Sequence, residues 1–134
     1  AISHYKRAIK LNPDFAQASN NLGNALVAEG KIEEAISHYK RAIKLNPDFA
    51  QAHYNLGNVL VAEGKIEEVI SHYKRAIKLN PDFAQAYNNL GAAMLNAKMT
   101  EEAIGYFKEA IRIQPDFIDA RNNLKVAISM LERE

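Results

Sequence analysis

Apolar residues recur at spacings of three and four along residues 50–63, which is the period of one face of an α-helix. The stripe consists of Ala52, Leu56, Val59 and Leu60. Residues 48–51 have the form of a capping box, so we expect this helix to begin near Phe49 or Ala50. Gly64 stands where a residue in the left-handed conformation would end it.

A second apolar stripe follows directly and predicts a second helix from about Ile66 to Leu79. Pro81 stops this helix, because proline cannot continue a helical hydrogen-bond pattern. Two helices joined by a short glycine-containing turn form an antiparallel hairpin. Gly57 lies inside the first helix, where glycine is unfavourable, so we expect a close approach of the second helix there, opposite Ala76.

The hairpin pattern recurs along the whole chain with a period of 34 residues. The phrase Pro-Asp-Phe appears four times at this spacing, and residues 1–18 recur unchanged at 35–52. A fixed period of this length predicts stacked supersecondary units that bury a continuous strip between neighbours. The expected units are a half repeat at 1–15, complete repeats at 16–49, 50–83 and 84–117, and a terminal helix at 118–134.

The repeated unit resembles the tetratricopeptide repeat. The matching positions in the second copy are Leu56, Gly57, Leu60, Gly64, Val69, Tyr73, Ala76 and Pro81. The resemblance implies an all-α fold, a right-handed superhelical α-solenoid of antiparallel helix pairs, in which the first helices line a concave groove. Two positions depart from the pattern. In the third repeat, Lys98 replaces the glycine that ends the first helix, and in the terminal helix, Lys125 replaces the internal glycine.

One asparagine per repeat would lie in that groove, at Asn21, Asn55, Asn89 and Asn123. A carboxamide offers two donors and an acceptor, so it can pair with both the N–H and the C=O of a peptide bond. A ladder of such residues suits an extended peptide held by its backbone. The alternative stays open that these residues only solvate the helix face, or were copied along with recent duplications. The other candidate peptide-binding residues are Gln17, Asn24, Gln51, Tyr54, Asn58, Gln85 and Asp119.

Two narrower resemblances bear on the ligand. The repeats are similar to those of the glycosyltransferase that attaches N-acetylglucosamine to protein serine and threonine, in Pro-Asp-Phe, in Asn-Asn-Leu-Gly and in the asparagine row. In some family members a two-carboxylate clamp grips acidic C-termini, and Asn24 and Asn55 match its asparagines. Asn20, Gln85 and Asn89 stand where that clamp needs cations, so a carboxylate would be held weakly.

Composition narrows the partner class further. Seventeen basic and sixteen acidic residues give a net charge of +1, which is not the basic excess of a nucleic-acid-binding protein. No apolar run reaches the length of a membrane span, and no signal peptide is visible. The absence of cysteine leaves the compartment open, with the cytoplasm as the expectation.

The sequence offers no candidate catalytic residue, cofactor or metal site. No phosphate-binding loop or nucleophile-base cluster is present. The histidines repeated on the second helices, His4, His38 and His72, would lie about 10 Å apart in stacked repeats, too far to share a metal ion. We expect them to be exposed or half-buried, with His53 standing alone.

These observations favour a non-catalytic scaffold that binds a protein or peptide. A structural array, designed or recently duplicated and without a specific ligand, is the alternative from a different class. A substrate-docking arm of a glycosyltransferase is a third. We also expect weak head-to-tail self-association through the terminal half repeats, because apolar positions at both ends need covering.

Overall fold

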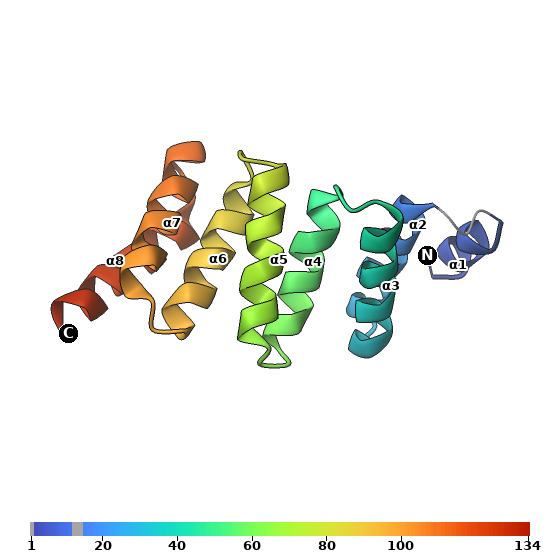
Figure 1. Ribbon diagram of the computed structural model, residues 1–134, viewed down its shortest axis with the longest axis horizontal. Helices are drawn as coiled ribbons and strands as arrows, with labels where there is room; N and C mark the ends of the chain where they lie inside the picture. Colours follow the sequence, from blue (N-terminus) through green and yellow to red (C-terminus); the bar gives the residue numbers. More distant parts are fainter. Residues whose placement is uncertain (1, 12–14) are drawn as a thin grey trace.

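The computed structural model describes residues 2–11 and 15–134, which fold into eight α-helices and contain no strand. The helices stand side by side in an elongated array with the two termini at opposite ends (Figure 1). The expected turn at Pro13 lies outside the described residues. The helices are α1 (Ile2–Leu11), α2 (Ala16–Ala28), α3 (Ile32–Leu45), α4 (Ala50–Val61), α5 (Ile66–Leu79), α6 (Ala84–Asn96), α7 (Thr100–Ile113) and α8 (Ile118–Glu132).

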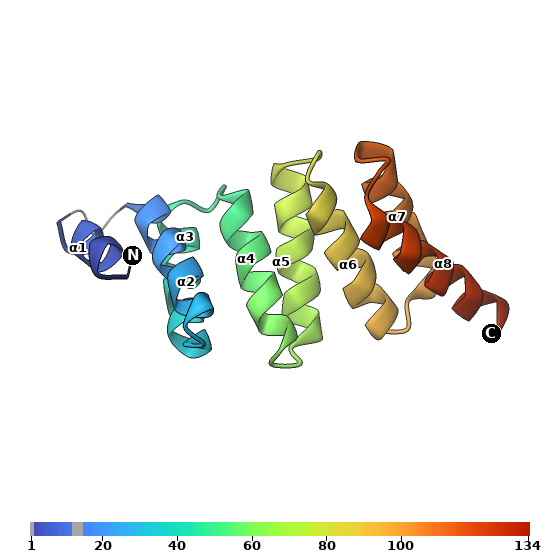
Figure 2. The same cartoon turned by 180° about the vertical axis from the view of Figure 1, so that it is seen from behind.

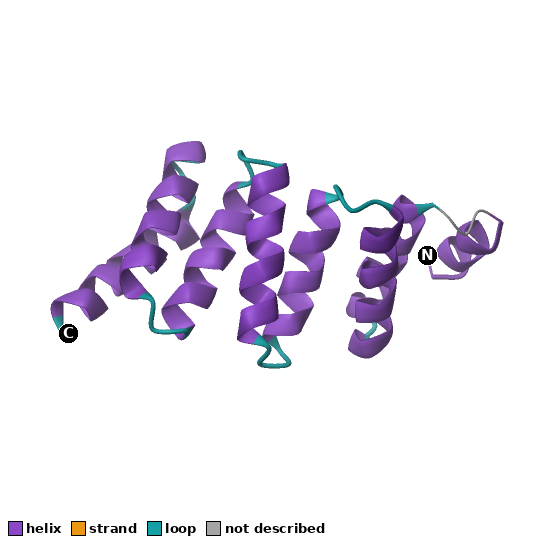
Figure 3. Ribbon diagram, viewed as in Figure 1, coloured by secondary structure: helices purple, strands orange, loops and turns teal. Residues whose placement is uncertain are grey.

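The helices form two layers. Figure 1 shows α3, α5 and α7 in front, and Figure 2 shows the opposite face, where α2, α4, α6 and α8 lie forward. We call the second set the first-helix layer. Each helix packs mainly on its neighbours in chain order, and short loops join successive helices (Figure 3). The expected all-α solenoid of stacked helix pairs is therefore confirmed.

The helix starts agree with the apolar pattern, but the capping box is wrong. Helix α4 begins at Ala50, and α5 spans Ile66–Leu79, both as predicted. The residue before α4, Phe49, makes no side-chain capping bond. Instead, the side-chain oxygen of Asn46 accepts a hydrogen bond from the N–H of Asp48 at 3.2 Å. The tight turn after α3 thus uses Asn46 to order the chain before the helix starts.

The turns that end α2, α4 and α6 each use one left-handed residue. Gly30 and Gly64 have φ angles of 78° and 71°, and Lys98 adopts the same conformation with φ of 63°. The turns at Gly30 and Lys98 also share the hydrogen bond that closes them. The N–H of Lys31 reaches the carbonyl of Leu26 at 2.9 Å, and the N–H of Met99 reaches that of Met94 at 2.9 Å. Lys98 therefore occupies the glycine position without its conformational freedom.

The glycine inside each of α2, α4 and α6 faces an aromatic ring, so the expected pairing with alanine is wrong. A Cβ atom on Gly57 would lie 2.6 Å from the ring of Tyr73 on α5, and one on Gly91 would lie 2.5 Å from the ring of Phe107. The ring, and not a second small residue, fills the space that a side chain would take. These rings join the buried leucines of the first-helix layer in one apolar strip along the solenoid.

Candidate functional site

The asparagine row binds neighbouring helices to one another. The side-chain Nδ2 of Asn55 on α4 donates to Oδ1 of Asn20 at 3.0 Å and to Oδ1 of Asn24 at 3.2 Å, both on α2. Asn20 is buried between the two helices, whereas Asn24 is exposed. The donor side of this carboxamide is therefore occupied within the protein.

The same bonds recur one repeat further along. Nδ2 of Asn89 on α6 donates to Oδ1 of Asn58 at 3.0 Å and to the hydroxyl oxygen of Tyr54 at 3.2 Å, both on α4. Nδ2 of Asn123 on α8 donates to Oδ1 of Asn88 at 3.0 Å. The sequence led us to expect either solvation of the helix face or pairing with a peptide backbone, and neither expectation includes these bonds between helices. The row ties each first helix to the one before it.

The oxygen side of the row is only partly used. Nε2 of Gln51 donates to Oδ1 of Asn55 at 3.0 Å, and Gln17 makes the same bond to Asn21 at 2.9 Å. A carboxamide oxygen has two acceptor positions, so one remains on each. Gln17 and Gln51, which were predicted as ligand contacts, thus orient Asn21 and Asn55 from the preceding helical turn.

A second pair of asparagines presents the opposite chemistry. Oδ1 of Asn24 accepts from the hydroxyl of Tyr39 at 2.7 Å as well as from Asn55. Asn58 has the equivalent bonds with Tyr73 and with the next asparagine of the row. Because both lone pairs of each oxygen are engaged, the N–H donors are what these exposed side chains offer to a ligand.

Burial keeps the two tyrosines as neutral donors. It raises the pKa of Tyr39 to about 12, and it raises the pKa of Tyr73 further, with the nearby Tyr54 adding to the shift. Both hydroxyls therefore keep their proton at neutral pH and hold their asparagine partners. In the third repeat, Phe107 stands where Tyr39 and Tyr73 stand, and Ala92 stands where Asn24 and Asn58 stand. Donor and acceptor are replaced together.

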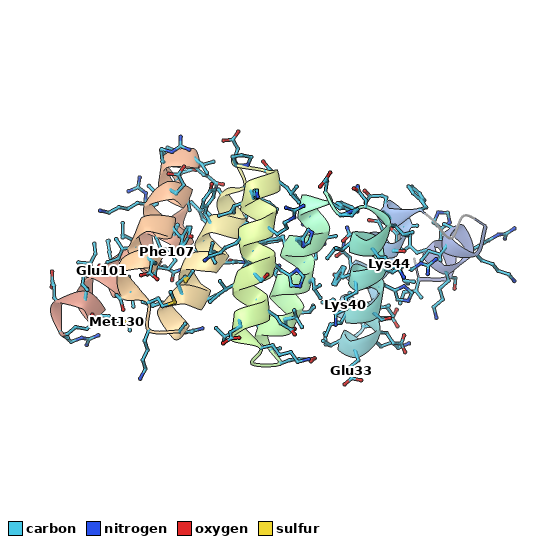
Figure 4. All side chains as sticks on the ribbon, in the orientation of Figure 1. Glu33, Lys40, Lys44, Glu101, Phe107 and Met130 are labelled. Carbon is cyan, nitrogen blue, oxygen red and sulfur yellow. The ribbon has the colours of Figure 1, made fainter. Side chains whose placement is uncertain are left out.

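The middle of the first-helix layer carries no formal charge. Helices α2, α4 and α6 contain no lysine, arginine, aspartate or glutamate. Charged residues such as Lys40 and Lys44 lie on α3 in the other layer (Figure 4). Helices α2, α4 and α6 thus form an amide-rich surface without charged residues, whereas the other layer carries basic and acidic side chains.

Two cavities open between consecutive first helices. The larger, of about 300 Å³, lies between α4 and α6 and is lined by Asn58, Val61, Ile66, Tyr73, Asn89, Ala92, Ala93 and Asn96. The smaller, of about 230 Å³, lies between α2 and α4 and is lined by Asn24, Val27, Tyr39, Asn55, Asn58 and Val59. The donor and acceptor amides described above stand at both cavities.

Family comparison accounts for nearly the whole chain. A family model described as "TPR repeat" matches residues 1–28, 23–62 and 57–97, and one described as "Tetratricopeptide repeat" matches residues 84–117. The chain belongs to the tetratricopeptide-repeat family. A search of curated proteins gave no match for it.

Three solved structures illustrate the shared tetratricopeptide-repeat architecture. The crystal structure of MamA superposes with a TM-score of 0.91 at 28% identity, covering 98% of this chain and 77% of MamA. A second MamA structure gives 0.88 at 29% identity, covering 96% and 70%. The first repeat domain of Spaghetti (RPAP3), bound to the HSP90 peptide SRMEEVD, gives 0.85 at 25% identity, covering 87% and 93%.

One contact in this tetratricopeptide-repeat protein was missed from the sequence. His53 does not stand alone: its Nδ1 lies 3.1 Å from Nδ1 of His72, and its Nε2 lies 3.1 Å from the carbonyl oxygen of Pro47. The sequence period shows only that these residues occupy the positions of Tyr87 and Tyr106. The contact itself is seen in the structure, where the centroids of those tyrosine rings also lie 6.4 Å apart. Our expectation from the sequence concerned only equivalent histidines in different repeats, so it did not include a pair formed within one hairpin.

The remaining predicted contacts lie at the margin of the site. Gln85 and Asp119 are exposed in the first turns of α6 and α8, and Tyr54 packs its ring on Phe83 with centroids 4.7 Å apart. In residues 2–11 and 15–134, no group of three or more metal-ligating side chains comes together. None of the helices described is both long enough and apolar enough to cross a membrane.

Proposed function

We propose that this chain is a non-catalytic protein-interaction scaffold that holds an extended peptide against α2, α4 and α6. The neutral, amide-rich surface of these helices carries the proposal. A peptide backbone is itself neutral and carries one donor and one acceptor per residue. The balanced charge of the chain supports a protein partner over nucleic acid or a membrane surface.

The recognising unit in this proposal is a pair of asparagines from adjacent helices. Asn24 supplies an N–H donor and Asn55 supplies an oxygen acceptor, and the two side chains are already hydrogen-bonded to each other. Asn58 and Asn89 form the second such pair. A peptide C=O and N–H can meet one pair without breaking the bonds between the helices, and each hydrogen bond contributes about 0.5–1.5 kcal/mol.

The same surface argues against an acidic ligand. The Spaghetti repeat domain binds a peptide ending in Glu-Glu-Val-Asp. Carboxylates are held well by charge-assisted hydrogen bonds from lysine or arginine. Because α2, α4 and α6 carry neither residue, we expect this chain to select neutral peptide segments.

A peptide array tests the proposal directly. The labelled chain is applied to neutral, basic and acidic peptides, with SRMEEVD as the acidic comparator. We expect binding to a subset of uncharged extended peptides and none to SRMEEVD at low micromolar concentration. Binding only to acidic peptides, or to none of the classes, would contradict the proposal.

Self-association is a second candidate, favoured by the exposed apolar residues of α8. Ile118 is 69% exposed and Val126 is 52% exposed. A second copy could cover them with α1, whose Tyr5 has the sequence position of Tyr39 and Tyr73. Lys125 opposes this contact, since it occupies the glycine position that faces the ring. Lys125→Gly should increase the sedimenting mass at high concentration, and an unchanged monomer would exclude this candidate.

The third candidate is a substrate-docking arm of a glycosyltransferase. It rests on the resemblance of the asparagine row and of the Pro-Asp-Phe phrase of this chain to the repeats of that class. The sequence of the parent gene tests it, because this candidate requires a glycosyltransferase domain in the same polypeptide. A parent gene without such a domain would remove it and leave the scaffold proposal unchanged.

A further inference from the structure

The two cavities of the first-helix layer are equivalent sites that differ in size. Asn24, Val27 and Tyr39 line the one between α2 and α4, and Asn58, Val61 and Tyr73 line the other at positions 34 residues later. Each therefore has an asparagine and a valine from one first helix and a tyrosine ring from the second helix. A ligand that follows the layer meets the same arrangement of asparagine, valine and tyrosine twice.

The facing wall accounts for the difference in volume. Asn58 and Val59 form it in the smaller cavity, of about 230 Å³, and Ala92 and Ala93 form it in the larger, of about 300 Å³. Replacing asparagine and valine by alanine removes side-chain atoms from the wall. The α4–α6 cavity is consequently the roomier of the two, and it is also lined by Ile66 and Asn96.

The larger cavity is suited to an apolar group. Val61, Ile66, Ala93 and the Tyr73 ring give it apolar walls, and none of its lining residues is charged. Val61 is 44% exposed, so apolar surface faces solvent beside the cavity. A volume of about 300 Å³ lies at the lower end of ligand pockets, which suits one side chain better than a larger molecule.

We infer that the α4–α6 cavity is a specificity pocket for one uncharged apolar side chain, of leucine or isoleucine size, on the bound peptide. This inference rests on the proposed function, because the peptide backbone is held by the adjacent asparagines. Asn58 and Asn89 line the pocket and offer the donor and the acceptor described above. The α2–α4 cavity, narrowed by Val59, accepts only a smaller side chain.

The test uses capped amino acids as probes, so that no natural ligand is needed. N-acetyl-leucine-N-methylamide, and its serine and lysine counterparts, are titrated into the full chain while amide and methyl NMR signals are followed. We expect saturable shifts at Val61, Ala92 and Ala93 with the leucine probe, and roughly tenfold weaker binding of the serine probe. Similar responses to all three probes, or leucine shifts located elsewhere, would overturn the inference.

Reciprocal variants make the test specific. Ala93→Val installs in the larger cavity the residue that narrows the smaller one, and should abolish the leucine response. Val59→Ala does the reverse and should create new leucine shifts at Val27. If Ala93→Val does not fold, Val59→Ala still tests the inference. If this variant shows no new leucine shifts at Val27, the assignment is contradicted.

The outcomes also separate this inference from the proposed function. An array-selected peptide that binds Ala93→Val with unchanged affinity and residue preference would overturn the pocket and leave the scaffold intact. A leucine response that is lost in Ala93→Val would support the pocket, whatever the peptide array shows. If the array then finds no peptide, the proposed function is contradicted and the pocket is not.

Discussion

The Nδ1 atoms of His53 and His72 lie 3.1 Å apart, across the interface between α4 and α5. The carbonyl oxygen of Pro47 only accepts hydrogen bonds, so Nε2 of His53 carries the proton that is directed to it. In the neutral ring, Nδ1 of His53 is then the acceptor and Nδ1 of His72 the donor. Protonating His53 would place two N–H groups face to face.

This pair should make the protein less stable in mild acid. Burial lowers the pKa of both rings below 6.5; Arg75 adds to the effect at His53, and the charge of His53 adds to it at His72, while Glu68 and the Pro47 carbonyl oppose it. The unfolded chain therefore binds more protons than the folded chain below pH 6.5. We expect the free energy of unfolding to fall as the pH is lowered from about 6.5, measured by urea denaturation at several pH values.

The double variant His53→Tyr/His72→Tyr is the matched control, because it copies the Tyr87 and Tyr106 pair of the next hairpin. Its stability should change less between pH 7 and pH 5 than that of the original chain. Some dependence remains, since burial also lowers the pKa of His38. Equal pH dependence in the two proteins would show that the pair does not titrate as described.

Lys98→Gly should stabilise the protein. Lys98 is the non-glycine residue with positive φ in the described ranges, at 63°, and left-handed backbone costs a side-chain-bearing residue about 1 kcal/mol. Glycine relieves this strain but gains freedom when unfolded, so the net increase should be up to about 1 kcal/mol. Lys65→Gly is the control, because Lys65 has φ of −87° and should gain nothing. A lower melting temperature for Lys98→Gly would refute the strain.

Two glycines inside helices should respond to alanine in opposite directions. Gly57→Ala places a Cβ atom 2.6 Å from the ring of Tyr73 and should destabilise the fold by about 1–3 kcal/mol. A Cβ atom on Gly105 of α7 would meet no atom within 4 Å apart from the neighbouring backbone of its own helix, so Gly105→Ala should stabilise by about 0.5–1 kcal/mol. Thermal unfolding measures both, and effects of the same sign would contradict the ring contact.

The bond between Tyr73 and Asn58 should behave as a coupled unit. Tyr73→Phe removes the donor and should cost about 0.5–1.5 kcal/mol, because the oxygen of Asn58 loses one partner. Adding Asn58→Ala reproduces the Phe107 and Ala92 combination of the third repeat. The double variant should lose less stability than the sum of the single variants in a denaturation cycle. Strict additivity would show that the two side chains are independent.

The helices could be predicted from the sequence because the same apolar stripes and helix-ending residues recur in each repeat. The apolar stripe gave α5 its limits, and Pro81 stops the helix by chemistry that no tertiary contact can reverse. The sequence marked Lys98 as the residue at the position of Gly30 and Gly64, and the structure gives it the same left-handed conformation. The family resemblance then supplied the stacking of hairpins.

The contacts between helices were less predictable. A glycine inside a helix, such as Gly57, indicates that another group packs closely against it. Only the structure identifies this group as the ring of Tyr73 and not as Ala76. The asparagine row was located correctly on the first-helix layer, yet its bonds to Asn20 and Asn24 depend on the distance between stacked repeats. Sequence spacing along one helix carries no information about that distance.

The most direct test of the central claim is the affinity of an array-selected neutral peptide for Asn55→Ala/Asn89→Ala, measured by calorimetry. Each substitution removes the acceptor of one amide pair, so affinity should fall by about 1 kcal/mol or more per position. Lys40→Ala/Lys74→Ala changes exposed residues of the opposite layer and should bind as the original chain does. Circular dichroism establishes that both variants remain helical. An unchanged affinity in the folded asparagine variant would contradict recognition by the asparagine row.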